Sequence, residues 1–242
     1  MKVRFLGTSH GVPEVNRASQ SMLFETENGA YLVDAGAPVI ERLVNCGIEL
    51  EKLKAVFITH QHYDHMAGLL NLLCLATWYF ETMSFTVYFT EECDTEDFKN
   101  FLAKFEPPVD RITYKVVKKG TFFDDGNMKV TAYPTSHMEH MGKNAYGYML
   151  ESEGKKVYVT GDMHPTLKDF PTENVKGGVD MFISECAHFP ERLLADKLKE
   201  IEAERIAIVH VFPKEKYPIF DKINESEFGN MIFPKDEEIF EI

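Results

Sequence analysis

The stretch Thr59-His60-Gln61-His62-Tyr63-Asp64-His65 decides the fold and the chemistry expected of this chain. It places three imidazoles and one carboxylate within six residues, directly after the apolar run Ala55-Val56-Phe57-Ile58. Imidazole and carboxylate groups together suit zinc, iron or manganese. Because alternate residues of an extended chain point the same way, His60, His62 and Asp64 can converge while His65 turns toward a second point. Four such donors would crowd one ion, so the pattern favours two adjacent metal ions.

The bulk composition bounds the class of protein. The chain has 242 residues, of which 44% are hydrophobic and 27% charged, as in ordinary soluble globular proteins. The net charge of -13 argues against a broad basic surface for nucleic acid, because such affinity comes largely from Lys and Arg on phosphates. A local positive site stays open, since two bound divalent cations would make their cleft the most positive place on the surface.

The cysteines and the chain start indicate the compartment. The four cysteines, at positions 46, 74, 93 and 186, have no CxxC spacing, which favours reduced thiols. Residues 1–7 lack the apolar core of a signal peptide, and the longest apolar stretch, 69–80, is too short to span a bilayer. We therefore expect a cytoplasmic protein. No linker, repeat or low-complexity run divides the chain, so a single domain over residues 1–242 is the expectation.

Hydrophobic patterning predicts strands in both halves, each followed by helices. Helices are expected at 39–45, 66–80, 97–105 and 190–201. Strands are expected at 3–6, 21–26, 30–33, 55–58, 85–89, 112–117, 129–133, 146–151, 156–160, 179–184 and 206–210, with closing strands at 231–233 and 238–242. This order is too rich in strands for a doubly wound parallel sheet. It indicates helices covering the outer faces of two packed sheets.

Residues that can bind metal recur where the expected strands end. Asp34 follows Tyr31-Leu32-Val33, and the cluster at 60–65 follows Val56-Phe57-Ile58. His137, Asp162 and His210 follow three later strands in the same way. Side chains at one end of several strands converge in space, and this is where sites form in layered α/β proteins.

This pattern resembles the five motifs of the metallo-β-lactamase-fold hydrolases, with Asp34 as the first motif, over nearly the whole chain. The resemblance implies an α+β fold, a four-layer αβ/βα sandwich of two packed mixed sheets with helices on the outer faces. It also implies a dinuclear centre, most simply of zinc, with manganese or iron as alternatives. By position in the motifs, His60, His62 and His137 would bind one ion, and Asp64, His65 and His210 the other. Asp162 would bridge the ions, and Asp34 would orient a ligand imidazole.

Within that family, the segment Phe5-Leu6-Gly7-Thr8-Ser9-His10-Gly11-Val12-Pro13 looks like the opening of ribonuclease Z and its phosphodiesterase relatives. Two departures argue against processing of transfer RNA. Ser184 stands where ribonuclease Z typically has a histidine, before a Glu that matches Glu185; His188 could substitute for it as a proton donor, or could simply be a histidine at a helix start. The segment between the second and third motifs is acidic, which would repel a phosphate backbone.

Three functions stay open from the sequence. The first is hydrolysis of a small or cyclic phosphodiester, with Asp64, Asp162 and His188 as the catalytic groups. The second is lactone or ester hydrolysis at the same site, which would need an apolar slot and a phenol such as Tyr63 or Tyr146; ribonuclease Z-like cleavage of RNA is a further variant. The third is a metal-bearing scaffold without activity. The expected partner is a small-molecule substrate rather than structured RNA or a membrane, with a homodimer possible.

Overall fold

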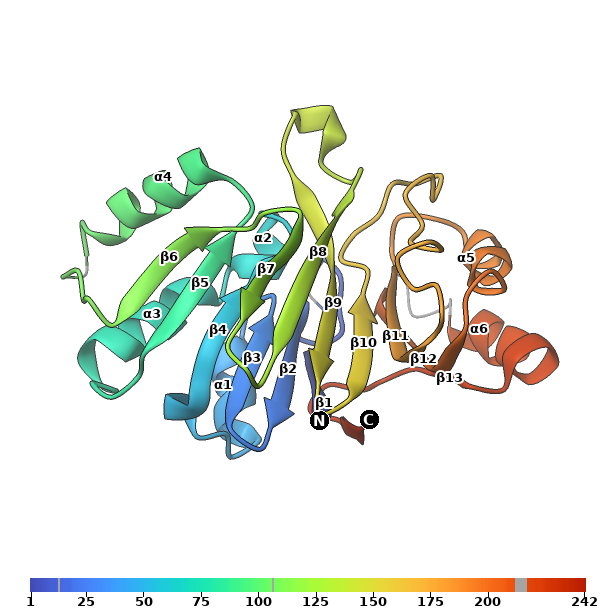
Figure 1. Cartoon of the computed structure of the whole chain (residues 1–242), viewed down its shortest axis with the longest axis horizontal. Helices are drawn as coiled ribbons and strands as arrows, with labels where there is room; N and C mark the ends of the chain where they lie inside the picture. The colour runs from blue at the N-terminus through green and yellow to red at the C-terminus, as the bar shows by residue number, and fades with distance from the viewer. Residues whose placement is uncertain (13, 106, 212–216) are drawn as a thin grey trace.

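The chain folds into two mixed sheets of seven strands each, which pack face to face with helices on their outer sides (Figure 1). This computed structural model describes residues 1–12, 14–105, 107–211 and 217–242; Pro13 of the loop motif lies outside them. The expected four-layer sandwich is confirmed. Within these described residues, no helix is long and apolar enough to cross a membrane.

Each sheet is antiparallel on one side and parallel on the other. In the first sheet the pairs from β3 to β6 are parallel, and in the second the pairs from β10 to β13 are parallel. The first sheet has the order β14 (Ile239–Glu241), β1 (Lys2–Gly7), β2 (Ser21–Thr26), β3 (Gly29–Val33), β4 (Leu53–Phe57), β5 (Phe85–Phe89), β6 (Ile112–Val116). The second has the order β13 (Met231–Ile232), β12 (Ala203–Val211), β11 (Val179–Cys186), β10 (Lys155–Val159), β9 (Ala145–Ser152), β8 (Lys129–Thr135), β7 (Gly120–Asp124).

Three apolar clusters hold the four layers together. The central cluster lies between the sheets and includes the fully buried Phe24, Phe57 and Tyr148. The outer face of the first sheet is covered by α1 (Val39–Asn45), α3 (Leu69–Trp78) and α4 (Glu92–Leu102). The outer face of the second is covered by α5 (Glu191–Leu198) and α6 (Tyr217–Ile223), which a π-helical turn at Asn224–Phe228 continues. Complete burial of each large apolar side chain contributes about 1.5–3 kcal/mol, so the three clusters dominate the stability.

Two of the expected helices differ most from those observed, while the helix expected over 190–201 ends three residues early, at Leu198. The helix expected over 66–80 is divided into α2 (Tyr63–Met66) and α3, with Gly68 between them. Gly68 donates its N–H to Ala35 O at 2.8 Å, and a Cβ there would lie 2.6 Å from Val39 Cγ1, so only glycine fits. The helix expected over 97–105 begins earlier, at Glu92, because acidic residues in a first turn are favoured by the helix dipole.

The buried tyrosines predict loss of stability at alkaline pH. Burial raises the pKa of Tyr31, Tyr148 and Tyr158, and raises that of Tyr114 to about 12. An unfolded tyrosine ionises near pH 10, so the unfolded chain releases protons first. The stabilisation is therefore complete below about pH 10 and is lost as the pH rises above it. Urea unfolding between pH 9 and 11 should show this fall, and Tyr148→Phe should make it shallower; a flat profile would contradict the prediction.

Candidate metal centre

The metal-competent side chains meet at one edge of the sandwich, where the carboxyl ends of strands from both sheets lie. The segment after β4 carries His60 and His62 and leads into α2, which carries Asp64 and His65. His137 follows β8, Asp162 follows β10, and His210 lies near the end of β12. The parallel pairing of β10, β11 and β12 brings the ends of these strands side by side, and short loops carry their polar residues to one place.

The first donor group consists of His60, His62, His137 and Asp162, whose nearest ligand atoms all lie within 4.8 Å of one another. Nδ1 of His62 is 3.0 Å from Nε2 of His60 and 3.1 Å from Nε2 of His137. Donors bound at about 2.0–2.1 Å around one tetrahedral ion are about 3.3–3.4 Å apart, close to these spacings. The group therefore fits one ion, with the three imidazoles that the sequence assigns to it.

The second donor group consists of Asp64, His65 and His210, whose ligand atoms also lie within 4.8 Å of one another. Oδ2 of Asp64 is 3.6 Å from Nε2 of both imidazoles. All three residues are buried. The group has the size and the donor chemistry of a second site.

Asp162 lies between the two groups. Its Oδ2 is 3.5 Å from Nε2 of His60, His65 and His210, and 3.6 Å from Nε2 of His137. Its other oxygen, Oδ1, is buried and accepts no hydrogen bond from any described residue. A buried carboxylate surrounded by four imidazoles, with one oxygen unsatisfied, fits a bridge between two cations.

Outer hydrogen bonds fix the direction of the donor imidazoles. Nδ1 of His65 donates to Oδ2 of Asp34 at 2.8 Å, which is the orienting contact expected of Asp34. Nδ1 of His210 donates to the carbonyl of Ser9 at 3.1 Å. Because carboxylate and carbonyl oxygens can only accept, each ring keeps its proton on Nδ1 and turns the Nε2 lone pair inward. Asp34 is held in turn by the N–H and hydroxyl of Thr59, at 2.8 Å and 2.9–3.0 Å.

The electrostatic environment keeps four of the donors, His60, His62, His137 and Asp162, in the forms that bind metal. Burial lowers the pKa values of His60, His62 and His137, so these rings are neutral at pH 7. Although burial alone would raise it, the pKa of Asp162 is held well below its usual range by His210 and His65. Burial alone would lower the pKa of His65, but Asp162 and Asp34 raise it well above its usual value, so a cation would take the place of a proton there.

His188 lies beside the donors, in the loop before α5. Its ring is 4.6 Å from that of His137, and its Nδ1 donates to Oε1 of Glu185 at 3.0 Å. Burial alone would lower its pKa, but the hydrogen bond and negative charge of Glu185, with Asp162, raise it to about 9. Two bound cations would oppose that rise. Ser184 is fully buried and donates to the carbonyl of Glu185, so its hydroxyl is committed within the protein.

A pocket of about 600 Å³ opens beside His137 and His188. Asp169 joins the two loops that form it, because its carboxylate accepts the N–H of Ser136 at 2.6 Å and that of His164 at 3.1 Å. The other side chains of its lining are mostly polar or charged: Ser136, Glu139, His140, His164, Pro165 and Lys168. The space is suited to the part of a substrate that extends beyond the metal centre.

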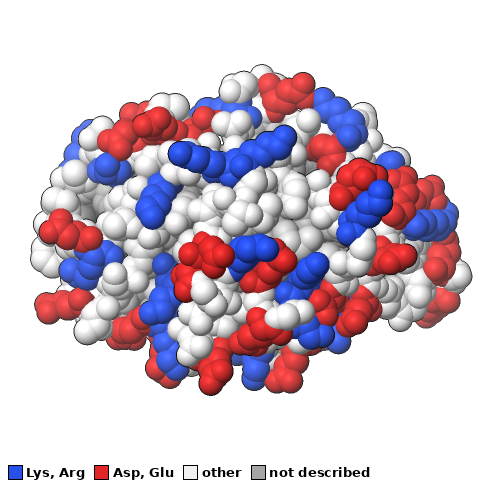
Figure 2. Space-filling view, in the orientation of Figure 1, with Lys and Arg blue, Asp and Glu red and all other residues white. Residues whose placement is uncertain are grey.

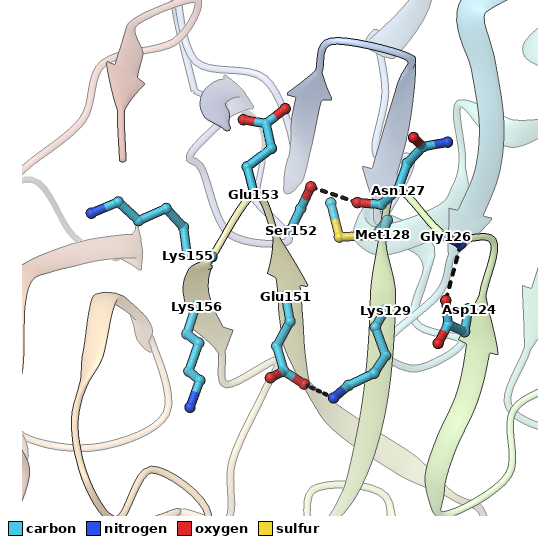
Figure 3. A pocket seen from close by; sticks show the side chains of 11 residues that line it. Asp124, Gly126, Asn127, Met128, Lys129, Glu151, Ser152, Glu153, Lys155 and Lys156 are labelled. Carbon is cyan, nitrogen blue, oxygen red and sulfur yellow. Dashed lines mark hydrogen bonds and ion pairs between the residues drawn. The ribbon is translucent and has the colours of Figure 1, made fainter.

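A second pocket, of about 310 Å³, lies at the opposite end of the second sheet, among the β7–β8 and β9–β10 turns (Figure 3). Its side chains bind one another: Lys129 pairs with Glu151 at 2.6 Å, and Ser152 donates to the carbonyl of Asn127 at 2.5 Å. The metal-competent residues follow the other ends of β8 and β10, so this pocket is no part of the centre.

The structure gathers at this edge all seven residues that the sequence predicts as metal ligands, with Asp34 beside them, but two outer contacts are not predicted from the sequence. Thr59, at the start of the histidine stretch, anchors Asp34 through its N–H and hydroxyl, a role that its position in the sequence does not indicate. Ser9 belongs to the opening segment at 5–13, and it contacts His210 through its backbone carbonyl rather than its side chain. No pattern of side chains in the sequence predicts a contact to a backbone carbonyl between residues 201 positions apart.

Comparison with known proteins agrees with this geometry. The chain is 32% identical over 161 residues to Ribonuclease BN of Escherichia coli O7:K1, covering 64% of this chain and 51% of that protein, so it spans about half the length of the curated relatives it matches. Its fold is similar to human tRNase Z, short form (TM-score 0.78, 18% identity, 100% and 99% of the two chains). It is also similar to the metallo-β-lactamase fold protein YhfI of Bacillus subtilis (TM-score 0.81, 21% identity, 99% and 98%).

The chain also matches a protein family over most of its length. The family described as Anti-Pycsar protein Apyc1 matches residues 1–203, which include six of the seven donors and His188. His210 lies beyond the matched range but within the same cluster in space. With the metallo-β-lactamase fold, the chain belongs to the Anti-Pycsar protein Apyc1 family.

Proposed function

We propose that this protein is a dinuclear metal-dependent hydrolase that cleaves a small or cyclic phosphodiester. The observation that carries the proposal is the position of Asp162. One of its carboxylate oxygens, Oδ2, lies 3.5–3.6 Å from imidazole nitrogens of both donor groups. When bound, two divalent ions, zinc first among them and manganese or iron as alternatives, would lower the pKa of water from 15.7 to about 7 and neutralise phosphoryl charge.

The catalytic roles follow from the donors' surroundings. Asp64 and Asp162 would hold the attacking water in line with phosphorus, and one of the two carboxylates would accept its proton as the water oxygen bonds to phosphorus. The bond between phosphorus and the leaving oxygen breaks, and that oxygen takes a proton from His188. Since Nδ1 of His188 is committed to Glu185, the proton comes from Nε2, on the side of the ring away from that carboxylate. General acid catalysis of this kind contributes about 10²–10⁴-fold.

The pocket beside His137 and His188 offers hydrogen-bond donors that a phosphodiester could use. Its lining carries His140, His164 and Lys168, which can donate hydrogen bonds to phosphate oxygens. Neither phenol that a lactonase would need is among the lining residues of this pocket: Tyr63, between His62 and Asp64, is 72% exposed, and Tyr146 is 7% exposed. Because this lining has no phenol, lactone hydrolysis is the less favoured of the two reactions.

RNA cleavage stays a second candidate because of the similarity to Ribonuclease BN, a nuclease by name. The charge distribution argues for a smaller substrate. On the face shown in Figure 2, Lys and Arg side chains are mixed with Asp and Glu around the edges, and one short run of basic side chains crosses the upper centre beside a mostly uncharged area. The net charge is -13, and α4 presents Glu92, Glu96 and Asp97 between the second and third motifs. A structured RNA needs an extended basic surface that this arrangement does not favour.

The cysteines support a reaction in the cytoplasm. All four lie within the described residues, and none is in a disulfide. Thiols that stay reduced are typical of a reducing compartment.

A turnover screen tests the proposal. Metal-reconstituted protein is offered a chromogenic linear phosphodiester, a 3′,5′-cyclic mononucleotide, a lactone and a precursor transfer RNA, with His62→Ala and chelator-treated protein as controls. We expect turnover of one or both small phosphodiesters, and its loss in both controls, because His62 is central to the first donor group. Turnover of the lactone alone, or of the RNA alone, would contradict the proposed substrate class.

A further inference from the structure

We propose that Asp236, near the chain terminus, is a positioning residue for the second donor group. It acts through the two arms of the loop that follows β1, Thr8–Val12 and Glu14–Ala18, here called the first loop. The inference rests on the metal centre proposed above and concerns the occupancy of one of its two sites.

The carboxylate of Asp236 joins the two ends of the first loop. Its Oδ1 accepts the N–H of Thr8 at 3.1 Å and the hydroxyl of Thr8 at 2.8 Å. Its Oδ2 accepts the N–H of Ala18 and lies 3.4 Å from a guanidinium nitrogen of Arg42. The side chain is only 5% exposed. Charge-assisted hydrogen bonds in such a buried setting are stronger than neutral ones, so this carboxylate is the anchor of the loop.

The first loop in turn holds His210. The carbonyl of Thr8 accepts the N–H of His210 at 2.9 Å, and the carbonyl of Ser9 accepts its Nδ1–H at 3.1 Å. His210 has a φ of 50°, in the left-handed region, which costs a non-glycine residue on the order of 1–3 kcal/mol and persists only where neighbours enforce it. Arg17 reinforces the contact, because it donates to Thr8 O at 2.6 Å and to Val211 O at 3.1 Å.

The same loop also contacts the carboxylate of the second group. A Cβ placed on Gly11 would lie 3.3 Å from Oδ2 of Asp64, so the loop backbone passes directly over that carboxylate. Two of the three donors of the second group therefore lie against the first loop. The three imidazoles of the first group instead come from the segments after β4 and β8. Release of the loop should thus weaken one metal site and spare the other.

The test compares metal binding by the full chain with that of Asp236→Ala and Asp236→Asn. The matched control is Glu237→Gln, since Glu237 is the next residue, is 34% exposed, and pairs with Arg42 and Asn45 rather than with the loop. Zinc affinities are measured by competition with a chromophoric chelator, and the visible spectrum of the cobalt-substituted protein reports each site's geometry. Thermal unfolding verifies that each variant is folded.

We expect the second ion of Asp236→Ala to bind about 10–100-fold more weakly, as for loss of other outer partners of metal sites, with the first ion unaffected. Asp236→Asn, which keeps one acceptor oxygen, should lie between Asp236→Ala and the native chain. If Asp236→Ala does not fold, the affinities of the two ions are compared in Asp236→Asn and Arg17→Lys instead.

If the folded Asp236 variants bind both ions with the same affinities as the native chain, the role of Asp236 is overturned while the proposed hydrolase stays intact. Weakening of both ions to the same extent would have the same meaning. Weakening of the second ion by Glu237→Gln to the same extent would overturn it too. A native chain that binds fewer than two ions would instead overturn the metal centre, and this inference with it.

Discussion

Replacement of Asp162 by asparagine is expected to abolish turnover and to release at least one metal ion. The substitution keeps the size of the side chain but removes its charge, and a neutral amide oxygen would hold two divalent cations much more weakly than a carboxylate would. The four imidazole Nε2 atoms that now lie 3.5–3.6 Å from Oδ2 of Asp162 would lose the negative charge among them. The loss of turnover should exceed the roughly 10- to 100-fold that removal of an outer partner costs.

Asp180→Asn is the matched control for this change. Asp180 is near the start of β11, away from the site, where it pairs with Lys155 at 2.7 Å and accepts the N–H of Lys156. Steady-state rates and metal content of both variants are compared with those of the native chain. A two-metal Asp162→Asn protein with turnover within tenfold of native would show that Asp162 does not bridge the ions.

The second large effect is on folding: Gly7→Ala should destabilise the protein by more than about 3 kcal/mol, beyond the usual range for overpacking. A Cβ on Gly7 would lie 1.9 Å from the carbonyl oxygen of Ser19 and 2.9 Å from that of Ala18. Both atoms belong to backbone, so neither can yield as a side chain would. The pairing of β1 with β2 shifts register between Phe5 and Gly7, which brings the two chain segments into this close approach.

Gly47→Ala separates this steric effect from the general effect of adding a methyl group. Gly47 has a φ of +67° and no heavy atom within 4 Å of its added Cβ, so alanine there should cost only about 1–2 kcal/mol for the left-handed backbone. Urea unfolding of both variants measures the difference. Equal destabilisation would mean that the contact with Ser19 is relieved at little cost.

Local patterning was enough to predict most of the fold. The helix at Val39–Asn45 and the strand at Phe85–Phe89 have the predicted bounds, because apolar periodicity and flanking turn residues specify them. The strand at Gly120–Asp124 was missed, since glycine, threonine and aspartate around Phe122 and Phe123 give no clear alternation. The division of the 66–80 helix depends on the close approach of Gly68 to Val39, a tertiary contact that no local pattern contains.

The candidate site was predictable for a different reason. Its donors are chemically distinctive residues at strand ends, and the structure brings all seven together. The supporting contacts were less predictable, because they use backbone atoms or residues distant in the sequence. The Asp236 carboxylate reaches Thr8 across 228 positions, and nothing in the local sequence of either residue indicates the pairing.

Metal content and position test the central claim most directly. Elemental analysis of pure protein, followed by anomalous diffraction at the edge of the metal found, should show two ions per chain. They should lie roughly 3.5–4 Å apart, one among His60, His62 and His137 and the other among Asp64, His65 and His210. Absence of a stoichiometric transition metal, or a single ion with these imidazoles turned away from one another, would contradict the account.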